Sequence, residues 1–210
     1  MNLEKLKQAQ AVFLHRFPGG FDNPELKAIR DKKHKPDQMI ALARESFSPE
    51  NFRHPLLVVQ NMEKVILRSS VISVFEKMSF RDFASRIGSQ EREFLGSGLE
   101  QLLYGDEQTG FEMILDLLKS EKLAKWTLMT VCQTYFHPQR DVFIKPTTVK
   151  RAINYFELEN LEYRPTPSWA FYEGYRSAFL NMKSKVDSSL APTNPAFSGF
   201  LRMIVRGEIG

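Results

Sequence analysis

Residues 123–163 read LAKWTLMTVCQTYFHPQRDVFIKPTTVKRAINYFELENLEY, and this stretch decides the fold. From Trp126 to Phe136 it carries no charged side chain, which is typical of a helix that is buried on most of its circumference. We expect Ser120 to cap this helix and Pro138 to end it, because the residue before a proline is disfavoured in the α region. The stretch therefore predicts a core helix against which the other helices pack.

Two short elements follow the core helix. Residues 141–144 look extended, but four residues without a partner strand are too few for a sheet, so we expect an irregular link over residues 141–146. Thr147 or Thr148 is expected to cap the next helix, whose first turn would then hold two cations. A cation there opposes the helix dipole, whereas an anion on the free backbone N–H groups is stabilised by it. The sequence therefore predicts a phosphate-binding site at Lys145, Thr147, Thr148, Lys150 and Arg151.

A plainer interpretation stays open, because a threonine before a helix is usually only a cap and grouped cations usually form a solvated face. A similar choice applies to the aromatic residues that follow. Trp169 and Tyr172, close in sequence to Arg164 and Arg176, form a candidate stacking surface for nucleic-acid bases. Aromatic residues at every third or fourth position are also typical of a helix that buries them.

The rest of the chain is rich in helix signals. A residue suited to helix capping precedes proline at four places, Asn23, Ser48, Thr166 and Asn194. Apolar residues recur at helical spacing in runs that include residues 3–17, 36–47, 56–75, 89–104 and 167–186. The run over residues 56–75 is the longest, with an interruption at Arg68 and an expected bend at Ser69 and Ser70, and we expect Ser79 to cap the next helix. These signals predict an all-α fold of nine to ten helices in a single compact domain.

The expected domain organisation has three parts. A helical body covers residues 1–186, and residues 187–195, with several serines and prolines, look like a linker. A terminal helix lies within residues 196–210, and its apolar stripe is expected to dock on the body or on a second copy of the chain.

Composition sets further bounds. The formal net charge of +4 on 210 residues permits nucleic-acid binding without indicating it. Residues 27–35 carry five lysines and arginines against Asp31, and the sequence does not fix whether this segment and residues 145–151 share a surface. The single cysteine excludes an internal disulfide and favours a cytoplasmic setting. No uncharged apolar run approaches the roughly 20 residues that span a bilayer, so no membrane association is predicted.

Motifs of catalysis are not found. The four histidines share no short spacing with cysteine or carboxylate residues that matches a metal site, and neither a metal nor a cofactor is predicted. Cys132 and His137 could form a nucleophile and base only if the fold brought them together. Because Cys132 lies in the apolar core helix, a packing role is the expected alternative.

The block from Lys122 to Arg176, KLAKWTLMTVCQTYFHPQRDVFIKPTTVKRAINYFELENLEYRPTPSWAFYEGYR, resembles a stretch of uncharacterised bacterial proteins of about this length. The resemblance covers roughly a quarter of the chain. It implies a bacterial cytosolic origin, and it assigns no activity and no residue role.

Three functions follow as hypotheses. The first is non-enzymatic binding of nucleic acid or of a phosphate-bearing ligand at the residues named above, with Trp169 and Tyr172 as the stacking surface. The second is a protein-interaction module or homodimer without catalytic activity, in which the terminal helix makes the contact. The third is an enzyme that uses Cys132 and His137.

Overall fold

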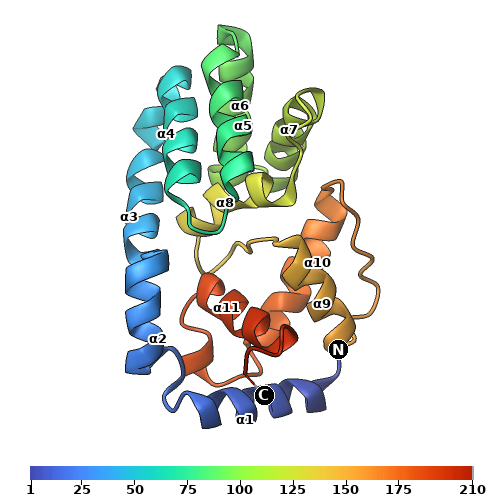
Figure 1. Ribbon diagram of the computed structural model, residues 1–210. Coiled ribbons are helices and arrows are strands. Elements are labelled where there is room, and N and C mark those ends of the chain that lie inside the picture. Colours follow the sequence, from blue (N-terminus) through green and yellow to red (C-terminus); the bar gives the residue numbers. More distant parts are fainter. Residues whose placement is uncertain (210) are drawn as a thin grey trace.

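The computed structural model describes residues 1–209, and over that range the chain forms eleven α-helices and four short 3₁₀ or π turns without a β-strand (Figure 1). The all-α prediction is confirmed, although the helices outnumber the nine or ten expected. Local caps support the short helices too. In α2 (Pro24–Ile29), for example, the Asn23 side chain accepts the N–H of Glu25. No helix in the described part of the chain is both long and apolar enough to cross a membrane.

The core helix is α8 (Trp126–Phe136), and every one of its residues is buried. It packs against α3 (Pro36–Ser46) and α4 (Pro55–Arg68), which agrees with its lack of charge. Two of its buried hydroxyls are satisfied within the helix, since Thr130 donates to the carbonyl of Trp126 and Thr134 donates to the carbonyl of Thr130. The predicted cap is wrong, because Ser120 ends the preceding helix and Lys125 takes the N-cap position of α8.

The α4 to α7 segment occupies one end of the molecule (Figure 1). There α4 packs against α5 (Val74–Arg86) and α6 (Ser89–Tyr104), and α6 packs closely against α7 (Glu107–Ser120). The closeness of α6 and α7 depends on Gly110, because a Cβ atom at this position would lie 2.2 Å from the backbone N of Leu102. No larger residue fits there without separating the two helices.

One predicted helix divides into two. The run over residues 56–75 stops at Arg68, and α5 begins at Val74 instead of after Ser79. Ser73 and Glu76 form a capping box, in which the Ser73 side chain accepts the N–H of Glu76 and the Glu76 carboxylate accepts the N–H of Ser73. This cap turns residues 69–73 into a short connection between α4 and α5.

The other end of the molecule holds α1 (Leu3–Arg16), α9 (Pro146–Tyr155), α10 (Trp169–Lys183) and α11 (Asn194–Val205) (Figure 1). The terminal helix α11 packs on α9 and α1, and its residues Phe197 and Phe200 are fully buried. Residues 187–195 contain the short turn η4 (Ser188–Leu190), whose Leu190 is also buried. The cap of α11 is Thr193, because Asn194 lies inside the helix and its side chain bonds to the carbonyl of Asp141.

The basic segment after α2 is helical rather than a turn. Residues Arg30–His34 form the π-helical element η2, and Lys35 then adopts a left-handed conformation with φ of 44° before α3 begins at Pro36. This geometry places the end of η2 beside the connection between α4 and α5, where the candidate site lies.

Candidate anion-binding site

The N-terminus of α9, where the sequence predicts a phosphate site, is largely satisfied by the chain itself. The helix begins at Pro146, which has no N–H, and Lys145 is the N-cap residue, so neither threonine caps the helix. The N–H groups of Thr148 and Val149 both donate to the carbonyl of Lys145, at 3.0 and 2.9 Å. Thr148 is buried and Thr147 is exposed. The backbone N–H groups at the start of α9 are therefore largely unavailable to an anion, so an anion there would have to bind side chains.

Two basic side chains from distant parts of the sequence meet at the connection over residues 69–73. The Nδ1 atom of His34 is hydrogen-bonded to the hydroxyl of Ser70 at 2.7 Å, and Lys145 Nζ donates to the carbonyl of Val71 at 3.3 Å. Because Ser70 and Val71 are neighbours, the end of η2 and the start of α9 lie on one surface. The two basic segments of the sequence are thus joined at this connection.

The core helix α8 holds this connection in place. The hydroxyls of Ser69 and Tyr135 are hydrogen-bonded at 3.1 Å in the interior, and Thr127 donates a short hydrogen bond to Glu76. The link before Lys145 is fixed in the same way, since the N–H of Ile144 donates to the hydroxyl of Thr130 at 3.0 Å. The site is therefore built on the most buried helix of the molecule.

Arg202 of the terminal helix α11 and Arg206 at its C-cap lie close enough to Lys145 to affect its pKa. Burial lowers the pKa of Lys145, and the positive charges of Arg206, Arg202 and Lys33 lower it further while Glu76 raises it. The pKa of His34 is also lowered, first by burial and then by the charges of Lys33, Arg202 and Lys145. We call these five residues the basic cluster: Lys33, His34, Lys145, Arg202 and Arg206.

Two carboxylates offset the basic cluster in part. Glu208 accepts an ion pair from Arg202 at 3.1 Å and one from Arg206 at 3.5 Å, and Glu76 lies close enough to Lys145 to raise its pKa. Among residues 1–209, four permanent cations thus lie near two carboxylates, which leaves an excess of positive charge there. The sequence signals the cluster through the basic run at 27–35 and through Lys145, but it does not show that α11 reaches α9.

The remaining cations of the predicted site lie apart from this contact. Lys150 and Arg151 are both exposed on α9, and the Nζ atom of Lys150 lies 4.8 Å from the centre of the Tyr163 ring. That position turns Lys150 towards the loop after α9. Of the five predicted phosphate ligands, Lys145 is the residue that the structure brings to other cations.

The predicted stacking surface is wrong for Tyr172, which is fully buried and stacks on Phe111 in the core. Trp169 is half-buried, packs edge-on against Phe111, and has the guanidinium of Arg176 at 5.5 Å from its ring. These aromatics are spaced for burial, which is the plainer of the two interpretations. Neither offers a free ring face beside the basic cluster.

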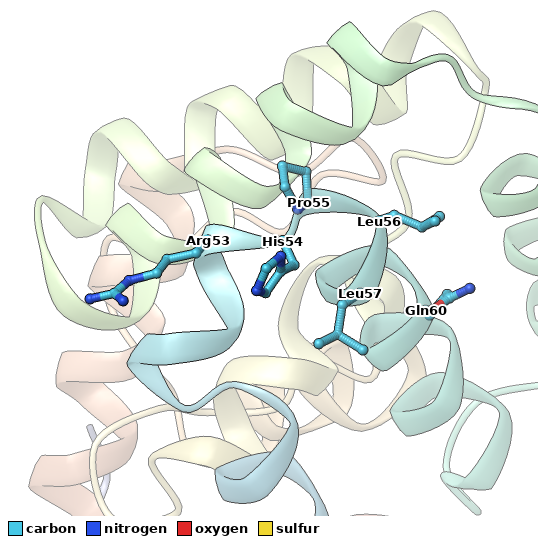
Figure 2. Close-up of a pocket in the computed structure, with 6 residues that line it drawn as sticks. All are labelled: Arg53, His54, Pro55, Leu56, Leu57 and Gln60. Atoms are coloured by element: carbon cyan, nitrogen blue, oxygen red, sulfur yellow. The ribbon is translucent and has the colours of Figure 1, made fainter.

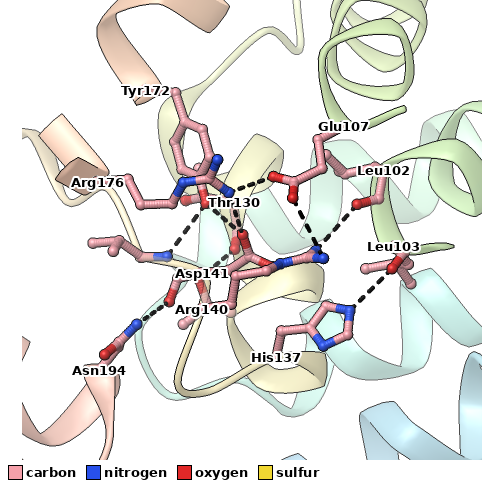
Figure 3. Close-up of polar contacts among 12 residues, drawn as sticks. Leu102, Leu103, Glu107, Thr130, His137, Arg140, Asp141, Tyr172, Arg176 and Asn194 are labelled. Atoms are coloured by element: carbon pink, nitrogen blue, oxygen red, sulfur yellow. Dashed lines mark hydrogen bonds and ion pairs between the residues drawn. The ribbon is translucent and has the colours of Figure 1, made fainter. Parts of the chain in front are cut away.

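A second group of charges lies inside the molecule, around Asp141 (Figure 3). The Asp141 carboxylate, 1% exposed, accepts hydrogen bonds from Arg140 at 2.9 and 3.1 Å, from Arg176 at 3.2 Å and from the Tyr172 hydroxyl at 3.0 Å. Glu107, in the first turn of α7, pairs with both arginines. Burial raises the pKa of Asp141, and the two arginines oppose this shift. Every charge in this group has a partner, which is typical of a structural clasp.

Cys132 and His137 do not form a catalytic pair. Burial raises the pKa of the Cys132 thiol to about 12, so it is not a thiolate at neutral pH. The His137 Nε2 atom donates to the carbonyl of Leu103 at 3.0 Å (Figure 3), which ties the end of α8 to α6. Both residues are used in packing.

Two hollows on the surface are lined by residues outside the basic cluster. One of about 390 Å³ sits where η3 (Pro49–Arg53) meets α4, and its lining side chains spread outward without meeting at a common point (Figure 2). Another of about 530 Å³ lies between α1 and the C-terminal residues Glu208 and Ile209. Within residues 1–209, no group of three histidine, cysteine or carboxylate side chains is arranged to hold a metal ion.

No protein-family model, curated protein or solved structure matches this chain, so the candidate site rests on geometry alone.

Proposed function

We propose that this protein binds nucleic acid, a phosphate-bearing polymer, through the basic cluster. The observation that supports the proposal is the meeting of His34 and Lys145 on the adjacent residues Ser70 and Val71. That contact joins η2 to the start of α9, and Arg202 and Arg206 at the end of α11 lie close enough to lower the pKa of Lys145.

The physical argument concerns repulsion between like charges. Cations that lower one another's pKa destabilise the free protein, and a bound polyanion relieves that cost. An isolated small phosphate compound would be expected in an enclosed pocket with converging polar groups. The cluster lies on an open surface, with Lys33 and Arg206 exposed, and such a surface suits the repeating charge of a polymer.

The proposal is tested with a variant that carries Lys33→Gln, Lys145→Gln and Arg202→Gln. The affinity for a labelled single-stranded oligonucleotide is measured by fluorescence anisotropy over a range of salt concentrations. Each phosphate contact contributes about 0.7 to the slope of log affinity against log salt for a single strand, so loss of three cations lowers that slope by about 2.

The matched control removes the same charge elsewhere. Its substitutions are Arg53→Gln in η3, Lys64→Gln in α4 and Lys119→Gln in α7, all at exposed positions. We expect the control to keep most of the affinity. The proposal fails if the wild-type protein does not bind at about 50 mM salt, where phosphate contacts are strong. It also fails if the control and cluster variants lose equal affinity.

A further inference from the structure

The most exposed large apolar side chain of the described chain follows the connection over residues 69–73, which His34 and Lys145 of the basic cluster contact. Phe75 is 86% exposed and its neighbour Val74 is 70% exposed, whereas the next most exposed, Ile29, is 50% exposed. Both residues lie in the first turn of α5. Together the two side chains form apolar surface that a ligand can remove from water.

The position of Phe75 is rigid. It follows Ser73 directly within the capping box, and Glu76 is held from its other side by the hydroxyl of Thr127 in α8. The first turn of α5 is therefore fixed to the core helix α8. The backbone that carries the Phe75 ring is thus held in place, so a ligand that covers the ring does not have to order the chain there.

The ring and the cations share one support. Lys145 donates to the carbonyl of Val71, and Phe75 is only four residues further along the chain. Even a fully extended chain places the Cα atoms of Val71 and Phe75 within about 14 Å of each other, at roughly 3.5 Å per residue. Glu76, the residue after Phe75, is close enough to Lys145 to influence its charge. Ring and cluster can thus contact neighbouring nucleotides of one strand.

We infer that the ligand is single-stranded nucleic acid, with Phe75 stacking on one base while the basic cluster holds nearby phosphates. This inference rests on the proposed function and names its substrate class. Unpaired bases have free faces that stack on aromatic side chains, whereas the faces of duplex bases are covered by their neighbours. Positive charge alone would favour any polyanion. The exposed Phe75 ring adds a preference for a single strand with free base faces.

The test compares one labelled oligonucleotide as a single strand and as a duplex, with the full-length protein. We expect Phe75→Ala to weaken binding of the single strand about tenfold, within the range for loss of a stacking aromatic residue. Duplex binding should stay unchanged. Phe75→Trp keeps a stacking ring and should retain the affinity, and Phe94→Ala, at another exposed phenylalanine on α6, should leave both substrates unaffected.

The outcomes separate this inference from the proposed function. If the wild-type protein binds neither strand form, the proposed function itself fails. If it binds both with the salt dependence expected of the cluster but Phe75→Ala changes neither, the stacking inference alone is overturned. It is also overturned if Phe75→Ala abolishes binding to phosphatidylserine-containing vesicles and leaves oligonucleotide binding intact. An unchanged thermal midpoint in Phe75→Ala shows that the fold is preserved.

Discussion

The molecule contains two gatherings of charged residues that follow opposite rules. Around Asp141, carboxylates and guanidinium groups alternate in the interior, and each charge is matched at hydrogen-bond distance. In the basic cluster, cations from three elements gather at the surface, and Glu76 and Glu208 offset them in part. The first arrangement joins helices, because it connects α7, α10 and the link after α8.

The contrast shows how to separate structural charges from functional ones. A buried charge must be paired because desolvation is expensive, so the Asp141 group is explained by folding alone. Cations that lie close together at the surface make the folded state less stable, and the packing of the helices does not require them to lie there. The basic cluster is therefore the part of the molecule that needs a ligand to account for it, and the following experiments test that distinction.

The largest effect is expected at Asp141. Replacing it with alanine leaves Arg140 and Arg176 without their shared buried partner, and removing one member of a buried pair costs about 3–5 kcal/mol. The free energy of unfolding from urea denaturation measures this loss. Asp82→Ala breaks an exposed pair with Arg81 and should cost less than about 1 kcal/mol. If Asp141→Ala lowers the free energy of unfolding no more than Asp82→Ala does, the ion pairs around Asp141 do not hold these helices together.

The sequence predicts features that depend on neighbouring residues better than features that depend on residues far apart in the chain. The uncharged run from Trp126 to Phe136 is a local signal, and it correctly predicts the buried core helix. Helix starts were predicted less well, because a capping residue before proline is only one of the local patterns. Thr166 lies outside α10, which begins at Trp169, while the capping box at Ser73 was missed.

The candidate site depends on contacts that no local pattern contains. Lys145 was identified from its place before Pro146, but its approach to His34 requires the path of the whole chain between them. Spacing alone also could not distinguish a stacking surface from a core, so Tyr172 was assigned to the wrong one. Phe75 was placed at the end of a run with an interruption at Arg68, but the new helix start at Ser73 was not predicted.

A smaller effect of opposite sign is expected at Lys145. Lys145→Met keeps the aliphatic stem but removes a half-buried cation that other cations repel, so the free protein should become more stable by about 0.5 kcal/mol. The same substitution should weaken oligonucleotide binding. Urea denaturation and fluorescence anisotropy measure the two effects. Lys150→Met, at the exposed cation over Tyr163, is the control and should not stabilise the protein. A destabilised Lys145→Met would instead make Lys145 a structural residue like Asp141.

The smallest expected effect is a pH dependence through His34. Burial and the charges of Lys33, Arg202 and Lys145 lower the pKa of His34 in the folded free protein, so the unfolded chain takes up its proton first as the pH falls. The His34 contribution to stability is therefore intact above about pH 6.5, the ordinary histidine pKa, and is lost as the pH falls towards the lowered value.

A bound polyanion should reverse the preference at His34, because phosphate favours the imidazolium form. Oligonucleotide affinity should then increase as the pH falls from about 7 to about 5.5, across the range in which histidine titrates. His34→Gln retains a hydrogen-bonding group for Ser70 and should flatten this dependence, whereas His15→Gln on α1 should leave it unchanged. An affinity that does not vary with pH in the wild-type protein would place the bound phosphates away from His34 and would limit the binding surface to α9 and α11.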